Sequence, residues 1–423
     1  MKIAVVGGGI SGLGSAWLLS EKHEVHLYEA DSRLGGHAHT VDVSEGSTKI
    51  PVDTGFLVYN ELTYPNLIGF FDTLGVETIG SDMSLSIMAK KDHLEWAGNN
   101  LNSIFGQRKN LLNPGFYYML YEIIRFGREA ESNLAEARRH ALTLGELLEK
   151  RRYSKRFLNH YLLPIGAAIW STPEAEMLSF PAETFIVFFI NHKLLQVNDR
   201  PQWRSVKNGS RQYVEKAAKR ISQIHLDSPV SSVDRKEGKV VVTSRGKSEV
   251  FDAVVLATHP PITTKILENI TAAESKILGV ISYESNRTIL HSDPEFMPKT
   301  KSCWSSWNVL GTGSGGFAKK VSLTYFINTL QSLPTKINYF VTLNPHAEIQ
   351  KPLQEFSYGH PKFDQTAIRA QRDLDLIQGS GGVYYAGAWT RYGFHEDGIL
   401  SAVKVSELLG VKAPWNKTTE NLS

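Results

Sequence analysis

The first 28 residues follow the pattern of a strand, a tight turn, a helix and a second strand. Residues 2–6 and 24–28 are largely apolar, and residues 11–20 have the composition of a buried helix. A cluster of glycines separates the first strand from this helix. The pattern predicts one βαβ unit at the start of an α/β domain.

Residues near 60 to 200 have the period of amphipathic helices, with capping signals between them. Asn113 and Pro114 are a capping pair, and the following residues then share one helical face: Phe116, Met119, Leu120, Ile123, Ile124 and Gly127. Thr143 and Glu146 form a capping box for a helix over residues 144–150. This region is expected to be an inserted helical domain.

Strand patterns return after residue 211. Residues 240–243 and 251–258 predict strands, and residues 288–290, 321–327 and 339–343 predict an antiparallel sheet. A last buried strand at 383–386 precedes a helix over residues 398–409. The polar tail after residue 412 is expected to be loose.

Composition excludes only extreme classes of protein. The 423 residues are 42% hydrophobic and 21% charged, so the chain is not disordered or fibrous. The net charge of +3 does not suggest a nucleic-acid-binding surface. Cys303 is the single cysteine, which rules out an internal disulfide. Glycines interrupt the apolar N-terminal run, so we expect a cytoplasmic protein rather than a signal peptide or membrane span.

The glycine-rich turn has the spacing of a dinucleotide site. Gly7, Gly9 and Gly12 fit G-x-G-x-x-G between a strand and a helix, where backbone amides approach a pyrophosphate. Glu29 follows the second strand, at the position where a carboxylate accepts the ribose hydroxyls. A carboxylate there also disfavours the 2′-phosphate of NADP.

Residues 29–36, followed by 52–55, resemble the amine-oxidase-type flavoprotein superfamily, and so do residues 229–233, 252–258, 386–389 and 393–399. The resemblance implies FAD as the cofactor. The cofactor-binding residues expected from the motifs and the resemblance are Gly7, Gly9, Ile10, Ser11, Gly12, Glu29, Ala30, Arg33, Gly35, Gly36, His37, Thr54, Gly55, Val230, Thr258, Gly387, Trp389, Glu396, Asp397, Gly398 and Ile399.

A narrower resemblance is to the FAD-binding oxidoreductases associated with cyclopropane fatty-acid synthases. The segments that carry it are residues 37–40, 52–61, 64–67, 81–84, 168–171, 200–203 and 392–398. It implies redox chemistry on a fatty-acyl chain held in a phospholipid, such as desaturation beside a methyl branch. It also implies a lipid methyltransferase as a partner, and some relatives belong to furan fatty-acid synthesis. The alternatives left open are an amine oxidase, a flavin-dependent fatty-acid isomerase and a non-catalytic partner of the methyltransferase.

Two segments are candidates for lipid contact. The apolar residues 185–190 either line an acyl tunnel or form a buried core helix. Residues 108–156 contain eleven Lys and Arg against six Asp and Glu. This stretch is either a solvated helical face or a surface for peripheral contact with anionic lipid at the inner face of the membrane.

His395 and Arg287 are the catalytic candidates. His395, Glu396 and Asp397 lie in the segment expected beside the flavin and are candidates for acid–base work. The structural alternative, favoured for Glu396 and Asp397, is that they only hydrogen-bond the flavin or cap the last helix. Arg287 stands where many amine-oxidase relatives have a lysine, and it is either an active-site group or a surface ion-pair partner. His37 and His39 have no third ligand nearby in the sequence, so no metal site is expected.

The expected fold is therefore α/β, with a Rossmann-type FAD-binding domain interleaved with a substrate domain of helices and antiparallel sheet. The FAD-binding domain is expected to comprise residues 1–60, 200–275 and 375–412. Residues 61–199 and 276–374 are expected to form the substrate domain, and residues 413–423 a tail.

Overall fold

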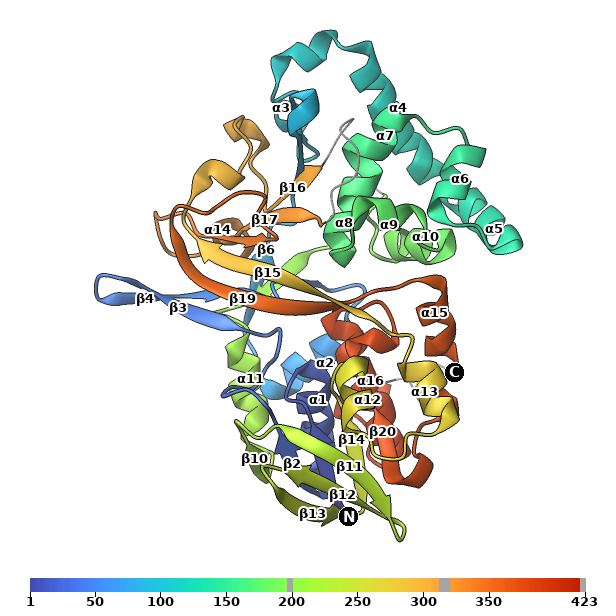
Figure 1. The fold of residues 1–423 in the computed structure, drawn as a ribbon. Coiled ribbons are helices and arrows are strands. Elements are labelled where there is room, and N and C mark those ends of the chain that lie inside the picture. Colours follow the sequence, from blue (N-terminus) through green and yellow to red (C-terminus); the bar gives the residue numbers. More distant parts are fainter. Residues whose placement is uncertain (196–200, 312–319, 419–423) are drawn as a thin grey trace.

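The computed structural model describes residues 1–195, 201–311 and 320–418. Arg200, the expected domain boundary at 199/200 and the last residues of the expected tail lie outside these ranges. The N-terminal part of the fold is built on a parallel sheet whose strands come from distant parts of the chain (Figure 1). Across the sheet the strands are β10 (Gln223–His225), β2 (Glu24–Tyr28), β1 (Lys2–Val6), β14 (Ala253–Leu256) and β20 (Val383–Tyr385).

The two faces of the parallel sheet are covered by different elements, which explains why the central strands β1 and β14 are apolar at every position after Lys2. Ile3 and Val5 face a layer of helices, whereas Ala4 and Val6 face the opposite side. The helical layer consists of α1 (Ile10–Leu19), α2 (Pro65–Leu74), α11 (Arg211–Ala218) and α16 (His395–Leu408). The opposite layer contains β11 (Val230–Lys236), β12 (Lys239–Ser244), β13 (Lys247–Phe251), α12 (Pro260–Ile266), α13 (Ala272–Leu278) and α15 (Gln365–Arg372).

A larger, mostly antiparallel sheet lies between this part and the helices at the other end of the molecule (Figure 1). Across the sheet its strands are β19 (Pro352–Pro361), β15 (Tyr283–His291), β18 (Phe340–Leu343), β17 (Ser322–Phe326), β16 (Trp307–Gly311), β7 (Leu85–Ala89) and β8 (Leu94–Ala97). The antiparallel sheet expected from residues 288–290, 321–327 and 339–343 is thereby confirmed.

The strands β7 and β8 correct the expectation that residues 60–200 are helical throughout. β7 pairs in parallel with β16, and its last four residues are buried. Because both faces of such a strand are covered, its sequence lacks the alternation that would reveal it. Short pairings complete the β-structure, namely β3 (Thr40–Glu45) with β4 (Thr48–Asp53), and β9 (Trp203–Val206) with β5 (Tyr59–Asn60) and β6 (Thr78–Ser81).

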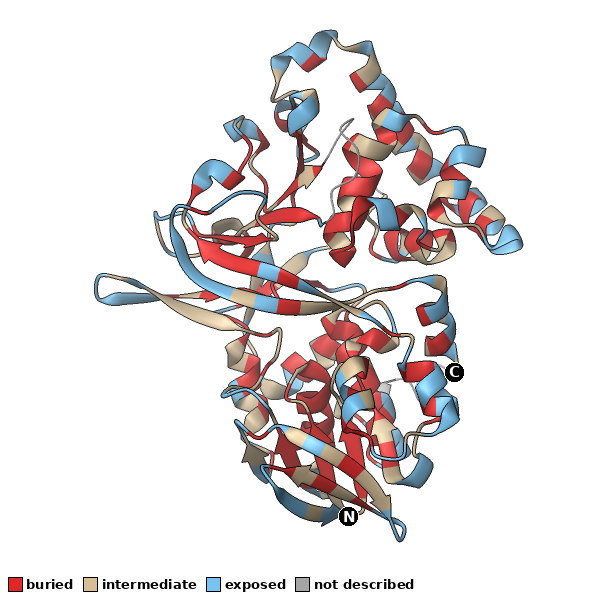
Figure 2. Ribbon diagram, viewed as in Figure 1, coloured by how far each residue is buried: buried red, intermediate tan, exposed pale blue. Residues whose placement is uncertain are grey.

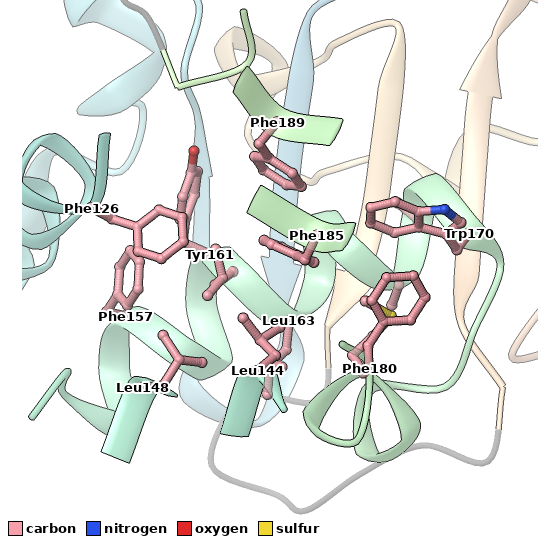
Figure 3. Packing of buried hydrophobic residues seen from close by; sticks show 14 of the residues in the cluster. Phe126, Leu144, Leu148, Phe157, Tyr161, Leu163, Trp170, Phe180, Phe185 and Phe189 are labelled. Atoms are coloured by element: carbon pink, nitrogen blue, oxygen red, sulfur yellow. The ribbon is translucent and has the colours of Figure 1, made fainter. Parts of the chain in front are cut away.

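The helices of the other end pack around one aromatic core (Figures 2 and 3). They are α3 (Leu101–Ile104), α4 (Pro114–Arg128), α5 (Ala130–His140), α6 (Leu144–Lys150), α7 (Lys155–Phe157), α8 (Leu163–Trp170), α9 (Glu174–Leu178) and α10 (Ala182–Asn191). Both expected caps are confirmed: the Asn113 side chain accepts a hydrogen bond from the Phe116 amide, and Thr143 and Glu146 form a capping box. Among the described residues, no helix has the length and apolar character needed to cross a bilayer.

The buried face of α4 differs slightly from the expected one. Phe116, Met119 and Phe126 point into the core, whereas Ile124 is exposed. Ile124 lies two residues before Phe126, about 200° around the helix, so both cannot face the same core. Figure 3 shows Phe185 and Phe189 of α10 inside this core, so these two side chains have the structural role.

The chain end is packed rather than loose over its first residues. Ala413 is buried, and the Trp415 ring lies 6.2 Å from that of Trp17. The Trp415 indole N–H also donates to the Asn66 side chain at 3.2 Å. The polar residues around Trp415 give this segment the composition of a loose tail. A single buried tryptophan leaves no periodic pattern that would indicate otherwise.

Candidate active site

A cavity of about 600 Å³ runs between the parallel sheet and the helical end. At one end it is lined by the glycine turn after β1 and by Glu29 after β2. Towards the other end the wall comes from β8, α8 and α10. The cavity therefore joins the expected dinucleotide site to the expected substrate region.

The glycine turn is shaped by backbone contacts that exclude side chains. Gly7 has φ +103°, a conformation that favours glycine, and its amide donates to the Tyr28 carbonyl at 2.8 Å. A Cβ on Gly12 would lie 1.8 Å from the Gly7 carbonyl oxygen. A Cβ on Gly9 would meet no protein atom within 4 Å, although Gly9 lines the cavity. The turn thus leaves room at the N-terminus of α1 for a ligand to approach the backbone.

Glu29 is positioned by the backbone around it. One carboxylate oxygen accepts the Gly8 amide at 2.6 Å and the other accepts the Asp31 amide at 2.9 Å. Each oxygen keeps further acceptor capacity for a ribose hydroxyl. This agrees with the role expected for Glu29.

Four buried ring nitrogens in the cavity wall have no hydrogen-bond partner within the described part of the protein. They are Nε2 of His37 and Nε1 of Trp170, Trp307 and Trp389. Buried polar atoms are normally satisfied, so these four indicate a polar ligand in the cavity. Together with the open turn and Glu29, the nitrogens of His37 and Trp389 fit a flavin dinucleotide.

The start of α16 lies against the start of α1. A Cβ on Gly398 would be 2.6 Å from the Ile10 side chain, so only a glycine allows this approach. Glu396 accepts hydrogen bonds from the Asn66 and Leu67 amides at the start of α2, at 3.1 and 2.9 Å. Asp397 accepts the Phe394 amide at 3.0 Å and so caps α16 itself.

These contacts favour a structural role for both acids over contact with the flavin. Asp397 caps the last helix, α16, as the alternative expected, whereas Glu396 caps α2 instead. Neither Glu396 nor Asp397 lines the cavity. Burial raises the pKa of Glu396 and raises that of Asp397 to about 7. Both carboxyls serve to hold helix ends close to the cavity.

His395 is a neutral, buried imidazole in the cavity wall. Its ring stacks on Phe56 at 3.7 Å, and its Nε2 lies 3.2 Å from the Tyr213 hydroxyl. Burial lowers its pKa to about 3. A neutral imidazole can accept a proton or orient a ligand without first losing a charge.

Three further histidines that the sequence did not single out line the cavity, namely His192, His259 and His360. His259 stacks on Tyr283 at 4.0 Å, and the His360 ring lies 5.3 Å from that of His37. Burial lowers the pKa of His259 and of His360 to about 4.

The tautomer of His360 follows from its neighbours. The Asn344 amide donates to Asn286 Oδ1 at 2.7 Å, which directs the Asn286 amide to His360 Nδ1 at 2.8 Å. His360 therefore carries its proton on Nε2. This contact crosses the pair β15 and β19, so no local sequence signal reveals it.

Arg287 has the surface role that the sequence left open, and not a catalytic one. It pairs with Glu355 on the neighbouring strand at 2.7 Å, with the two side chains 55% and 53% exposed. It does not line the cavity. Residue 287 points away because neighbouring positions of a strand face opposite sides of the sheet.

The expected cofactor residues divide into two groups. Those lining the cavity are Gly7, Gly9, Ile10, Ser11, Glu29, Ala30, Gly35, Gly36, His37, Gly55, Val230, Thr258, Gly387 and Trp389. Those behind its wall are Gly12, Arg33, Thr54, Glu396, Asp397, Gly398 and Ile399. The second group shapes the site, as when Arg33 donates to the Gly36 carbonyl of its own turn at 2.9 Å.

The end of the cavity away from the glycine turn is apolar and aromatic. Its wall includes Trp96, Tyr161, Ile165, Ile169, Trp170, Phe188, Trp307, Tyr325, Phe363 and Phe394. Among the described residues, Glu29 is the one Asp, Glu, Lys or Arg that lines the cavity. This end offers a substrate contact area without a fixed charge.

Comparison with known proteins places this site in context. The family model described as flavin containing amine oxidoreductase matches residues 10–318. The flavin-containing amine oxidase A of Canis lupus familiaris is 25% identical over 284 residues, covering 62% of this chain and 50% of that protein. The Bos taurus amine oxidase A has the same identity and coverage. The chain thus spans about half the length of the curated relatives it matches.

Solved structures share the fold over nearly the whole chain. Cyclohexylamine oxidase from Brevibacterium oxydans has a TM-score of 0.68 at 16% identity, covering 97% of this chain and 99% of that one. A CLA-producing fatty acid isomerase from P. acnes has a TM-score of 0.64 at 12% identity, covering 96% and 97%. The α/β FAD-binding fold with a second part of helices and sheet, expected from the sequence, is confirmed.

Proposed function

The chain belongs to the flavin containing amine oxidoreductases and is an FAD-dependent oxidoreductase, and from this premise we propose that it oxidises fatty-acyl chains esterified in phospholipid. The proposed reaction is desaturation of a methyl-branched or related chain. As the resemblance to oxidoreductases of cyclopropane fatty-acid synthases implies, a lipid methyltransferase is the proposed partner.

The observation that carries this proposal is the lack of charge in the substrate end of the cavity. Of the described residues that line it, only Glu29 is charged, and it lies at the dinucleotide end. A cationic amine would find no carboxylate there, and a free fatty acid would find no cation for its carboxylate. An esterified acyl chain requires neither.

Desaturation removes one hydrogen from each of two adjacent carbons, which together amount to two electrons and two protons. Hydride acceptance is the chemistry that FAD would supply when held by the glycine turn and Glu29. The other hydrogen leaves as a proton, and the ring nitrogen of His395 that does not face Tyr213 is the candidate acceptor. The aromatic wall around Trp170 and Phe188 orients the chain and excludes water.

Amine oxidation is the second candidate. Trp170, Trp389 and Tyr392 present aromatic rings in the cavity wall, and such rings attract cations even without a carboxylate. The names of the matched relatives also favour it.

The deciding experiment mixes the oxidised holoprotein anaerobically with detergent-dispersed phospholipid carrying unsaturated, methyl-branched or cyclopropane chains. Loss of flavin absorbance together with a product two hydrogens lighter is expected. Bleaching by cyclohexylamine or putrescine, with none by any lipid, would replace the proposal by amine oxidation. A moved double bond without net bleaching would indicate an isomerase instead.

A variant that narrows the apolar end of the cavity tests whether the acyl chain of the substrate lies there. Ile165→Trp, within α8, is expected to lower the rate of flavin reduction by long acyl chains at least about tenfold. The FAD absorbance spectrum should not change, because Ile165 lies away from the glycine turn. Ile165→Val is the matched control and should react like the unmodified protein. Equal rates for Ile165→Trp would show that the substrate does not occupy this end.

A further inference from the structure

Among the described residues, the largest group of exposed apolar side chains lies on one continuous segment at the helical end of the molecule. We call it the apolar surface and define it as Leu101, Leu111, Leu112, Tyr117, Tyr118, Tyr121 and Ile124. Leu112 is 90% exposed and Leu101 is 75% exposed. Figure 1 shows that α3 and α4, which carry part of it, form the far end of the molecule from the parallel sheet.

Direct contacts join several of these residues, and the others lie beside them on the same segment. The Tyr117 hydroxyl donates to the Leu111 carbonyl at 3.1 Å, and the Tyr117 ring lies 5.6 Å from that of Phe105, at the end of α3. The rings of Tyr118 and Tyr121 are 6.0 Å apart. A contiguous exposed apolar area of this kind marks an interaction site.

The charge around the apolar surface identifies its partner. Residues 99–128 contain Arg108, Lys109, Arg125 and Arg128, and their one acidic residue, Glu122, is completely buried. Arg125 is paired with Glu129 at 3.0 Å, so the exposed cations of this segment are Arg108, Lys109 and Arg128. Exposed leucines and tyrosines flanked by cations match an anionic phospholipid bilayer, with apolar groups inserted and cations at the headgroups.

The cavity wall reaches this same segment. Gly98 and Asn99 line the cavity, and Asn100, the next residue, caps the helix α3 that begins at Leu101. An acyl chain that leaves the cavity past Asn99 would therefore emerge beside the apolar surface.

We propose that the apolar surface docks the protein on anionic phospholipid bilayers and so places the nearby end of the cavity at the lipid. The docking itself is independent of the proposed function, whereas the transfer of an acyl chain from the bilayer rests on it.

The test is flotation of the holoprotein with phosphatidylcholine vesicles, with and without 30% phosphatidylglycerol. Binding to the anionic vesicles is expected at low salt, and 0.5 M NaCl should weaken it. The double variant Leu111→Ser/Leu112→Ser is expected to lower the partition coefficient at least about tenfold. Arg108→Gln/Lys109→Gln should lower it about tenfold for anionic vesicles and have little effect on neutral ones.

Matched controls come from the opposite end of the molecule. Leu376→Ser removes a leucine that is also 75% exposed, and Lys265→Gln/Lys276→Gln removes two exposed cations. Both should float like the unmodified protein. The FAD spectrum of every variant verifies its fold.

Absence of binding to anionic vesicles at low salt would overturn the proposal, as would unchanged binding of the Leu111→Ser/Leu112→Ser variant. A concentration-dependent dimer that this variant abolishes, without vesicle binding, would overturn it in favour of a second copy of the chain. Flotation detects no oxidation, so its failure is distinct from a failure of lipid to bleach the flavin.

Discussion

Gly9 and Gly12 stand three residues apart, but a methyl group on each would meet different surroundings. On Gly12 it would collide with the Gly7 carbonyl, whereas on Gly9 it would project into the open cavity. One glycine therefore serves the protein's own packing and the other serves the ligand.

We expect Gly12→Ala to lower the unfolding temperature and to abolish FAD binding together. Gly9→Ala should leave the unfolding temperature of the flavin-free protein unchanged while weakening FAD binding at least about tenfold, because the methyl displaces the ligand. Thermal unfolding of both forms and flavin titration measure this. Tight FAD binding by Gly9→Ala would show that the cofactor does not approach this turn.

His395 is the one residue for which the predicted catalytic role and the cavity coincide. We expect His395→Gln to slow anaerobic flavin reduction by acyl lipid at least about 100-fold, with the FAD spectrum retained. Tyr213→Phe removes only the 3.2 Å contact to Nε2 and should slow it less. Because the pKa of His395 is about 3, neither rate should follow a titration near pH 6.5. An unchanged rate in His395→Gln would exclude the imidazole as proton acceptor.

Helix ends near the cavity depend on side chains from distant elements. Glu396 stands at the start of α16, yet it accepts the first free amides of α2, about 330 positions earlier in the chain. A carboxylate at a helix N-terminus also interacts favourably with the helix dipole.

Removing this cap should lower the free energy of unfolding more than it weakens FAD binding. We expect Glu396→Ala to cost about 2 kcal/mol of unfolding free energy, because the buried Leu67 amide and the half-buried Asn66 amide lose their acceptor. Glu396→Gln retains an acceptor oxygen and should cost less. Denaturant unfolding of the flavin-free protein measures both. Wild-type stability of Glu396→Ala combined with lost FAD binding would restore the cofactor role inferred from the sequence.

Several histidines of the described chain are held as neutral imidazoles because burial lowers their pKa, and they outnumber the buried carboxyls whose pKa is raised. Burial lowers the pKa of His395 to about 3 and lowers the pKa to about 4 for His39, His192, His259, His291 and His360. Unfolding returns each to about 6.5, so the unfolded chain binds more protons below that pH. Their stabilising effect is complete above pH 6.5 and is lost as the pH falls towards 4.

Three buried carboxyls act in the opposite direction. Burial raises the pKa of Glu396, raises that of Asp53 to about 6 and raises that of Asp397 to about 7, so their contributions weaken as the pH rises from about 4 to 7. The histidines outnumber them, and we expect the unfolding temperature to fall by at least about 5 °C from pH 7 to pH 5. His291→Asn, away from the cavity, should make the decrease shallower, whereas the exposed His140→Asn should not. Equal unfolding temperatures at pH 5 and 7 would contradict this.

Much of the fold was accessible from the sequence because it depends on neighbouring residues. The glycine turn and the caps at Asn113 and Thr143 are set by backbone conformations and hydrogen bonds within a few positions. Glu29 follows from the same local logic, since a βαβ unit brings the end of its second strand beside the turn.

Tertiary structure alone decided which distant residues meet. Three contacts join segments that are far apart in the sequence and share no local pattern. Arg287 pairs with Glu355, Asn286 orients His360, and the Trp415 ring packs on that of Trp17. Such contacts follow from burying several apolar layers at once, which is a property of the assembled core. The sequence therefore determined the flavoprotein fold and its dinucleotide turn, and the packing determined the uncharged substrate end of the cavity and the histidines around the cavity.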